Sequence, residues 1–332
     1  MVALGLASDR MPVSGEPLSG GVSSNIWRID LPSGPVCAKQ ALEKLKVAAD
    51  WRAPVIRTAY EAAYLAFVSQ VAPGATPRVL ARHEALGVLV LEYLPVNAYP
   101  TWKAQLIAGD VDAGLAARIG AMLGIVHQHS AEDASLRAQF ANLDLFRSLR
   151  IEPYFAAAGA ANPDVAQRLC QLGEVFEDNC TALVHGDFSP KNILVGRDRV
   201  VILDAECAVF GDPAFDVAFC LTHLLLKATV VRHATHALHN AFTAFVESHG
   251  AQFNRAGLHN RTARYIGGLL LARLDGKSPV EYLTHDTVRA RVRAFAKDEL
   301  HRLADTPFDV AARWYPMWDT AQPAAPMEKQ TG

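Results

Sequence analysis

A run of eight residues, 185–192, constrains this chain more than any other feature of its sequence. The run reads His-Gly-Asp-Phe-Ser-Pro-Lys-Asn, so Asn192 follows Asp187 by five positions. Kinase catalytic loops use this spacing: the Asp accepts the proton of a hydroxyl group, and the Asn holds a magnesium ion. The run therefore predicts a phosphoryl-transfer site with Asp187 as the catalytic residue and Asn192 as a metal ligand.

The segment after this run offers further oxygen ligands. Two short apolar runs, residues 193–195 and 200–203, flank a polar four-residue stretch, which is the pattern of a hairpin. The hairpin would return Asp204 and Glu206 to the neighbourhood of the catalytic loop. Carboxylate and amide oxygens are the ligands that Mg²⁺ prefers. We therefore expect Asp204 to bind Mg²⁺ together with Asn192, and Glu206 to be an additional or water-mediated ligand.

An Asp and an Asn near a turn often meet by chance, but here a His-Gly, a hairpin and an acidic pair accompany them. Together these residues resemble the aminoglycoside phosphotransferase and choline kinase-like superfamily. Its pattern is H-G-D-x-x-x-x-N, then I-D-x-[DE], then G-D-P-x-x-D, and residues 211–216 supply the third element. The resemblance spans roughly residues 14–303. It implies an ATP- and Mg²⁺-dependent transfer of the γ-phosphoryl group to a hydroxyl of a small molecule.

The same resemblance implies an α+β, two-lobed, protein-kinase-like fold. The smaller N-lobe would contain an antiparallel sheet, and the larger C-lobe would be mainly helical. On this basis we predict an ATP-binding N-lobe over residues 1–92 and a catalytic and substrate-binding C-lobe over residues 93–320. Residues 321–332 are predicted to be a disordered tail.

The first third of the chain has the features of a nucleotide-binding lobe. A Gly/Ser-rich stretch with Gly20 and Gly21 precedes two predicted strands, residues 26–31 and 36–39, and the second strand ends at Lys39. Glycines let backbone N–H groups approach phosphates closely, although a Gly-Gly pair alone more often marks a simple hairpin loop. In the kinase arrangement, Gly20 and Gly21 would cover the phosphates and Lys39 would hold the α- and β-phosphates of ATP.

A kinase lysine needs an acid from the next helix to hold it in place. Residues 53–71 have helical spacing of apolar side chains, and Glu61 lies among them. Arg57 precedes Glu61 by four residues, so the two could instead form an ordinary surface pair. The family pattern favours the pairing of Lys39 with Glu61.

Beyond the small lobe, the sequence predicts a hinge and then helices. A strand over residues 86–94 would lead into the hinge, where the main chain of Tyr93 or Leu94 would contact the adenine ring. Farther on, Asp212 is expected to cap a helix. Asp216, in the first turn of that helix, would either brace the catalytic loop, as in the family, or only complement the helix dipole.

Composition limits the partners and the location of the protein. The 332 residues include 32 basic and 34 acidic side chains, a net charge of −2, which gives no sign of a nucleic-acid or membrane-seeking surface. The five cysteines show no C-x-x-C spacing, and the N-terminus lacks the pattern of a signal peptide. We therefore expect a cytoplasmic protein that binds neither nucleic acid nor membrane. The family resemblance implies that its partner is a small hydroxyl compound.

The identity of that compound is less constrained. From Arg255 to Arg302, ten Lys and Arg residues outnumber five Asp and Glu residues. This excess argues mildly against a cationic acceptor, an aminoglycoside or choline, since these need acidic or aromatic surroundings.

A finer resemblance points to the 5-methylthioribose kinase branch, which would make the acceptor a sugar hydroxyl. The residues that carry it are Lys39-Gln40, Trp51, Arg57, Glu61, Trp102-Lys103, Asp204 and Glu206. The chain departs from that branch at Asn192, where a Ser is usual, and it lacks an adjacent Arg pair in its C-terminal part. Aminoglycoside-type and choline-type kinases stay open as alternatives. A nucleotide-binding pseudokinase, acting as a sensor, is the alternative from a different class.

Overall fold

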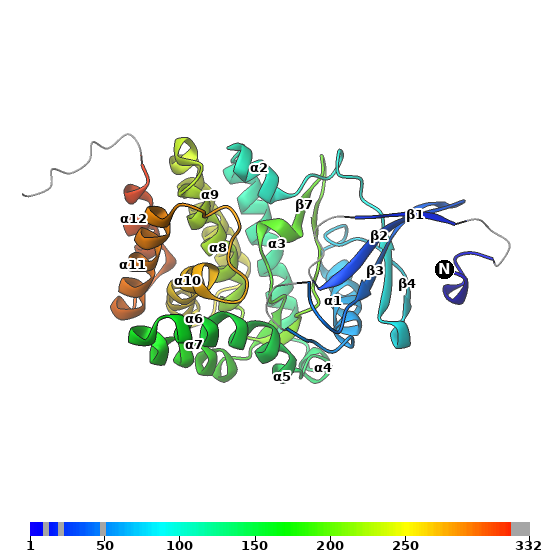
Figure 1. Cartoon of the computed structure of the whole chain (residues 1–332), viewed down its shortest axis with the longest axis horizontal. Helices are drawn as coiled ribbons and strands as arrows, with labels where there is room; N and C mark the ends of the chain where they lie inside the picture. The colour runs from blue at the N-terminus through cyan, green and yellow to red at the C-terminus, as the bar shows by residue number, and fades with distance from the viewer. Residues whose placement is uncertain (9–12, 19–22, 47–50, 320–332) are drawn as a thin grey trace, which may run out of the picture.

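A five-stranded antiparallel sheet forms the first part of the chain (Figure 1). The computed structural model describes residues 1–8, 13–18, 23–46 and 51–319. The strands lie in the order β1-β2-β3-β5-β4, and they span Ser14–Pro17 (β1), Ser24–Leu31 (β2), Gly34–Ala41 (β3), Val79–His83 (β4) and Val88–Glu92 (β5). The three strands predicted for this region are confirmed as β2, β3 and a somewhat shorter β5.

Helix α1 (Arg57–Val71) connects β3 to β4 and packs against β3, β4 and β5. Its apolar side chains Tyr64, Leu65 and Val68 are fully buried, which stabilises its position between the sheet and the helical part of the chain (Figure 1). The sequence predicts a helix that starts after Pro54, whereas α1 starts at Arg57. The residues between them form single turns first, with the N–H of Thr58 donating to the carbonyl of Val55.

The pairing of β3 with β5 decides which side chains of the sheet face α1. Lys39 lies opposite Leu89 in this register, and Leu89 is fully buried. Because side chains alternate along a strand, Cys37 and Lys39 share this inner face while Ala38 points to the other one. The sheet therefore turns Lys39 toward the helix that carries Glu61.

The rest of the described chain is mainly helical, as predicted. Its helices are α2 (Trp102–Ala108), α3 (Ala113–Ala131), α4 (Ala134–Gln139), α5 (Leu143–Phe146), α6 (Ala157–Ala161), α7 (Ala166–Asp178), α8 (Ala214–Ala228), α9 (Thr235–Gln252), α10 (Leu258–Asp275), α11 (Asp286–Arg302) and α12 (Pro307–Trp314). A π-helical segment, η3 (Arg147–Ala156), joins α5 to α6. It contains Pro153, which has no N–H to donate to an α-helical ladder.

Two short strand pairs enclose the segment that carries the predicted catalytic residues. Strand β6 (Ala182–Val184) pairs with β9 (Val209–Gly211), and β7 (Ile193–Val195) pairs with β8 (Val200–Ile202). The β7–β8 pair is the hairpin that the sequence predicts after the catalytic loop.

Helix α8 forms the centre of the helical core, since each of its fifteen residues is buried. It packs against α9 and α10, and α9 also packs along α3. Asp212 accepts a hydrogen bond from the N–H of Ala214 (3.1 Å). It therefore supports the helix start, although the N-cap position itself falls on Pro213, one residue later than predicted.

The C-terminal aromatic residues dock onto this core. Trp314 donates a hydrogen bond from its indole N–H to the carbonyl of Leu225 on α8 (2.9 Å), and Trp318 is buried. The predicted disordered tail, residues 321–332, lies outside the described residues. Within the described ranges, no single helix is both long and apolar enough to cross a membrane. One pair of consecutive helical segments, Ala214–Ala228 and Arg232–Gln252, reaches that length and apolarity together, but the two are bent by 119° relative to each other.

Candidate active site

The predicted catalytic loop, residues 185–192, follows β6, and a carboxylate of α8 fixes its start. Asp216 accepts hydrogen bonds from the backbone N–H groups of His185 (2.6 Å) and Gly186 (2.9 Å). Asp216 is fully buried, and His127 of α3 lies 3.5 Å from its carboxylate. Of the two roles left open for Asp216, the structure shows the brace of the catalytic loop.

Gly186 and His185 give the loop its shape. Gly186 has φ +77°, and a Cβ there would lie 2.9 Å from the carbonyl oxygen of Cys207, so only glycine fits. His185 Nε2 lies 2.9 Å from the carbonyl oxygen of Leu203, and its Nδ1 accepts from the N–H of Asp187 (3.1 Å). Burial lowers the pKa of His185. A neutral imidazole with its proton on Nε2 satisfies both contacts and ties the loop to the end of β8.

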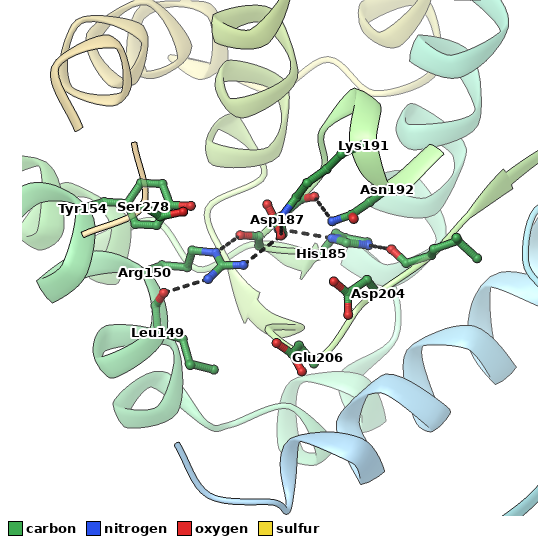
Figure 2. A network of polar contacts seen from close by, with 12 residues as sticks. Leu149, Arg150, Tyr154, His185, Asp187, Lys191, Asn192, Asp204, Glu206 and Ser278 are labelled. Atoms are coloured by element: carbon green, nitrogen blue, oxygen red, sulfur yellow. Dashed lines mark hydrogen bonds and ion pairs between the residues drawn. The ribbon is translucent and has the colours of Figure 1, made fainter. Parts of the chain in front are cut away.

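The carboxylate of Asp187 is held by two cations. Its Oδ2 lies 2.9 Å from Lys191 Nζ and 3.2 Å from an Arg150 guanidinium nitrogen (Figure 2). Burial opposes ionisation, but these cations outweigh it and hold the pKa of Asp187 below its usual value. Its other oxygen, Oδ1, is buried and has no hydrogen-bond partner within the described part of the chain. Asp187 is thus an oriented, ionised carboxylate with one unused acceptor.

The sequence motifs assign no role to Lys191 or Arg150. Lys191 lies within the run 185–192, four residues after Asp187, so the spacing of the two residues allows their contact to be predicted. Arg150 comes from η3, where it also donates to the carbonyl of Gly186 and is buried. The local sequence around residue 150 does not predict the contact between Arg150 and Asp187, because that contact depends on how η3 packs against the loop.

A backbone hydrogen bond brings Asn192 close to Leu203, the residue before Asp204. The N–H of Leu203 donates to the carbonyl of Asn192 (2.8 Å). The side-chain N–H of Asn192 donates to the carbonyl of Asp187 (3.0 Å), which leaves its amide oxygen available as a ligand. Asp204 has φ +65°, an uncommon conformation for a residue other than glycine and one that clusters at functional sites.

Lys39 connects this acid to the sheet. Its Nζ lies 2.9 and 2.8 Å from the two carboxylate oxygens of Glu61, and it also contacts Asp204 Oδ1. Burial lowers the pKa of Lys39, but Asp204 and Glu61 outweigh that effect and raise it well above the usual value. The predicted contact between Lys39 and Glu61 is present, and Asp204 is a second carboxylate in contact with the Lys39 ammonium group.

Glu206 has a partner that the sequence did not reveal. Its Oε2 lies 3.0 Å from Nε of Arg57, which is fully buried. Arg57 also donates to the carbonyls of Ala53, Pro54, Ser23 and Leu42. The alternative of a surface pair between Arg57 and Glu61 is therefore wrong. Arg57 is buried and binds Glu206 and four backbone carbonyls, and we call it the Arg57 clamp; Glu61 binds Lys39 instead.

The donor set fits a phosphate-bound magnesium ion rather than a closed metal cage. Within the described ranges, no group of three or more His, Cys, Asp and Glu side chains converges closely enough to hold a metal. Mg²⁺ at phosphate sites usually takes one or two carboxylates and keeps waters and phosphate oxygens as its other ligands. Asp204 and the free amide oxygen of Asn192 suit that pattern. Direct binding by Glu206 stays a prediction.

The other predicted nucleotide contacts are located only in part. Gly20 and Gly21 lie outside the described residues. Tyr93 and Leu94 directly follow β5 at the start of the connection to α2, and the Arg28 guanidinium lies 5.3 Å from the centre of the Tyr93 ring. Their contact with adenine stays a prediction.

Comparison with known proteins agrees with this geometry. Residues 14–245 match the model of the phosphotransferase enzyme family (APH). The chain belongs to this family. A methylthioribose kinase of Pectobacterium atrosepticum is 27% identical over 251 residues, 67% of this chain and 62% of that protein. A second methylthioribose kinase, from Bacillus pumilus, is 27% identical over 54% of its length, so the chain spans less than two thirds of either relative.

Solved structures confirm the fold that the sequence predicts. A choline/ethanolamine kinase family protein from Mesorhizobium loti has a TM-score of 0.51 at 18% identity, over 94% of each chain. An amicoumacin kinase in complex with AMP-PNP and Ca²⁺ has a TM-score of 0.51 at 16% identity, over 90% of this chain and 91% of that one. At these identities, the likeness concerns the fold.

Proposed function

We propose that this protein is a small-molecule kinase that transfers the γ-phosphoryl group of ATP to a hydroxyl group, with Mg²⁺ as cofactor. The observation that carries the proposal is the unused, buried oxygen of Asp187. An ionised carboxylate with one oxygen fixed by cations and the other free is arranged to accept a hydrogen bond from a hydroxyl. This oxygen lies on the same loop as Asn192, which is joined through Leu203 to Asp204 and Lys39.

The reaction asks mainly for positioning and for neutralisation of charge. Lys39, held by Glu61, would bind the phosphate tail of ATP. Asp204 and Asn192 would hold Mg²⁺, which when bound neutralises charge on the phosphates. Asp187 would orient the acceptor hydroxyl and take its proton as the new bond to phosphorus forms.

Lys191 and Arg150 determine the protonation state of Asp187 and which of its oxygens is free. Because both cations hold the pKa of Asp187 below its usual value, its carboxylate stays ionised and can accept a hydrogen bond from the acceptor hydroxyl. Their shared use of Oδ2 leaves Oδ1 for the substrate.

A sugar hydroxyl is the first acceptor to test. Support comes from the methylthioribose kinase relatives and from the Asp204/Glu206 pair that the sequence shares with that branch. A nucleotide sensor without turnover is the second candidate, and the intact set of Lys39, Asp187, Asn192 and Asp204 argues against it.

An assay that couples ADP release to a spectroscopic signal separates these candidates. The purified chain would be given Mg-ATP alone, and then with 5-methylthioribose, other sugars, amino alcohols or aminoglycosides. Stimulation of ADP release by a hydroxyl compound, lost in Asp187→Asn, is the expected result. Tight binding of Mg-ATP without stimulation by any compound would favour the sensor.

A further inference from the structure

A group of basic side chains from α2, α8 and α10 lies outside the set of residues proposed above to hold the nucleotide. We call it the basic cluster: Lys103 on α2, His223 and Lys227 on α8, and Arg273 on α10. Lys227 Nζ lies 3.4 Å from the carbonyl oxygen of His223 and 5.5 Å from the centre of the Tyr282 ring. The segment after α10, which carries Tyr282, thus lies next to Lys227 of α8.

Two cations of the basic cluster, Lys227 and Arg273, have no acid at ion-pair distance among the described residues, whereas Lys103 pairs with Glu281. Lys227 is completely buried, yet no carboxylate within the described ranges lies at ion-pair distance from it. Arg273 is also buried, and its guanidinium donates only to neutral oxygens, those of Ser278 and Tyr154. Glu281 is the acid of this region, and it pairs with Lys103 on the exposed side.

Leaving an ammonium group buried without a counter-charge is costly. Burial, together with the neighbouring charges of Lys103 and Arg273, lowers the pKa of Lys227 to about 7. An anion bound beside Lys227 would restore its charge. The protein alone provides no such anion among its described residues, so the cluster is electrostatically incomplete.

Hydrogen-bonding capacity is unused at the same place. Nε2 of His223, Nε of Arg273 and the hydroxyl of Tyr282 are buried atoms without a hydrogen-bond partner in the part of the chain that the structure describes. His223 is 6% exposed, so water reaches it poorly. Buried polar groups normally have hydrogen-bond partners, and a small anion beside Lys227 and Arg273 would supply acceptors for the unused N–H and O–H groups of Arg273 and Tyr282.

A continuous set of contacts leads from the basic cluster to Asp187. Arg273 donates to the hydroxyl of Tyr154 (3.3 Å), and the Tyr154 ring lies 5.6 Å from the guanidinium of Arg150. Arg150 in turn pairs with Asp187 at 3.2 Å. In Figure 2, Tyr154 and Ser278 lie on one side of Asp187 and Asp204 lies on the other. The contacts through Tyr154 thus connect the Arg273 end of the cluster to the side of Asp187 that faces away from Asp204.

We infer that the basic cluster binds a carboxylate or phosphate group of the acceptor, so that the substrate is an acidic hydroxy compound. This inference rests on the proposed kinase activity and specifies its substrate class. An acceptor whose anionic end contacts Lys227 and Arg273 would have its hydroxyl end directed toward Asp187. Cationic acceptors would be repelled by the cluster. A neutral sugar such as methylthioribose would leave Lys227 unpaired and bind less tightly than its acidic counterpart.

Binding measurements with simple sugars and anions test this inference directly. The full chain, saturated with Mg-AMP-PNP, would be titrated with three compounds that share one skeleton: D-ribose, D-ribonate and D-ribose 5-phosphate. Inorganic phosphate serves as a fourth, skeleton-free probe, read by its effect on Tm. Ribonate and ribose 5-phosphate separate a preference for carboxylate from one for phosphate. Failure to bind AMP-PNP would count against the kinase proposal itself, so the two failures are distinguishable.

Two variants and one control assign the binding to the cluster. Lys227→Met removes the buried charge at nearly constant volume, and we expect it to weaken anion binding about 10- to 100-fold, as loss of a charged hydrogen bond does. Lys103→Gln, on the partly exposed side, frees Glu281 to compete for Lys227 and should also weaken binding. Lys297→Met removes a lysine that pairs with Asp164 outside the cluster and should leave anion binding unchanged.

Each outcome of these titrations either supports or overturns the inference. Binding of an acidic probe at least ~10-fold tighter than ribose, a difference of about one decade in the dissociation constant, together with its loss in Lys227→Met, supports the inference. Equal binding of ribose and the acidic probes overturns it. So does the absence of any Tm rise with inorganic phosphate in the wild type, or undiminished anion binding in both Lys227→Met and Lys103→Gln.

Discussion

Arg57 and Glu206 form a buried ion pair that joins helix α1 to the segment after β8, with Nε 3.0 Å from Oε2. The same guanidinium binds the carbonyls of Ser23 and Leu42. Arg57 therefore holds together the sheet, its first helix and the segment that carries Asp204. The position of one metal-binding candidate relative to Lys39 depends on this pair.

Removing Arg57 should strongly destabilise the protein. In Arg57→Met, the carboxylate of Glu206 remains buried without a partner, and breaking such a pair typically costs about 3–5 kcal/mol. Urea unfolding of the two proteins measures the difference. As a control, Arg28→Met removes a partly exposed pairing with Glu16 and Asp30 and should cost at most ~1 kcal/mol. A similar small cost for both variants would show that Arg57 is not a clamp.

Lys39 should govern the use of ATP. Lys39→Met leaves Glu61 and Asp204 as uncompensated neighbouring acids that repel the phosphates, so we expect turnover to fall by ~100-fold or more, since lost transition-state charge stabilisation has this scale. Steady-state kinetics with varied Mg-ATP measures the loss, and Lys297→Met is the matched control. Retention of wild-type kinetics in Lys39→Met would contradict the assigned phosphate-binding role.

Asp216 should matter for chemistry although it lies behind the catalytic loop. In Asp216→Asn, one acceptor oxygen becomes an NH₂ group that faces the N–H of His185 or Gly186. The loop then loses a charged hydrogen bond, so kcat should fall about 10- to 100-fold. Nucleotide affinity, measured by titration with Mg-AMP-PNP, should change much less. Asp112→Asn, which alters the cap of α3, is the control; an equal loss of kcat there would point to a general folding effect.

Lys227 should make stability depend on pH in a defined direction. Its pKa is about 7 when folded and near 10.5 when unfolded, so between these values the unfolded chain binds more protons and stability rises with pH. Below pH 7 the wild type carries the full cost of burying Lys227, roughly 5 kcal/mol at most. Lys227→Met removes this cost, and its Tm should exceed that of the wild type near pH 7.

Measuring Tm for both proteins from neutral to alkaline pH checks this prediction. The difference between them should shrink toward pH 10.5, since other titrating groups contribute equally to both. A difference that stays constant over the range would show that Lys227 is not held in the unfavourable environment described above.

Much of the fold and of the site follows from local sequence patterns. Alternating strands, the hairpin after residue 192 and the helix with Glu61 are encoded by period and by turn residues, and the structure contains each of them. The pairing of Lys39 with Glu61 followed from the kinase-like pattern, whereas that pattern left the brace by Asp216 as one of two possible roles.

What the sequence could not reveal depends on packing between distant segments. Arg57 is four residues from Glu61, which suggests a helix-surface pair, but burial of the helix start turns it to Glu206 instead. Arg150 contacts Asp187 because η3 packs against the loop, and no spacing rule connects these positions. The basic cluster likewise gathers side chains from α2, α8 and α10, whose mutual placement is a property of the helical core.

The central claim is that Asp187 is the catalytic residue of a phosphoryl transfer to a hydroxyl group. The most direct test is the rate of ADP formation with Mg-ATP and an accepted hydroxyl compound, compared between the wild type and Asp187→Asn, with Mg-AMP-PNP titrations of both. The account predicts near-equal nucleotide affinity and a loss of turnover of at least ~100-fold, the scale expected for a catalytic base. Near-wild-type turnover in Asp187→Asn would contradict it.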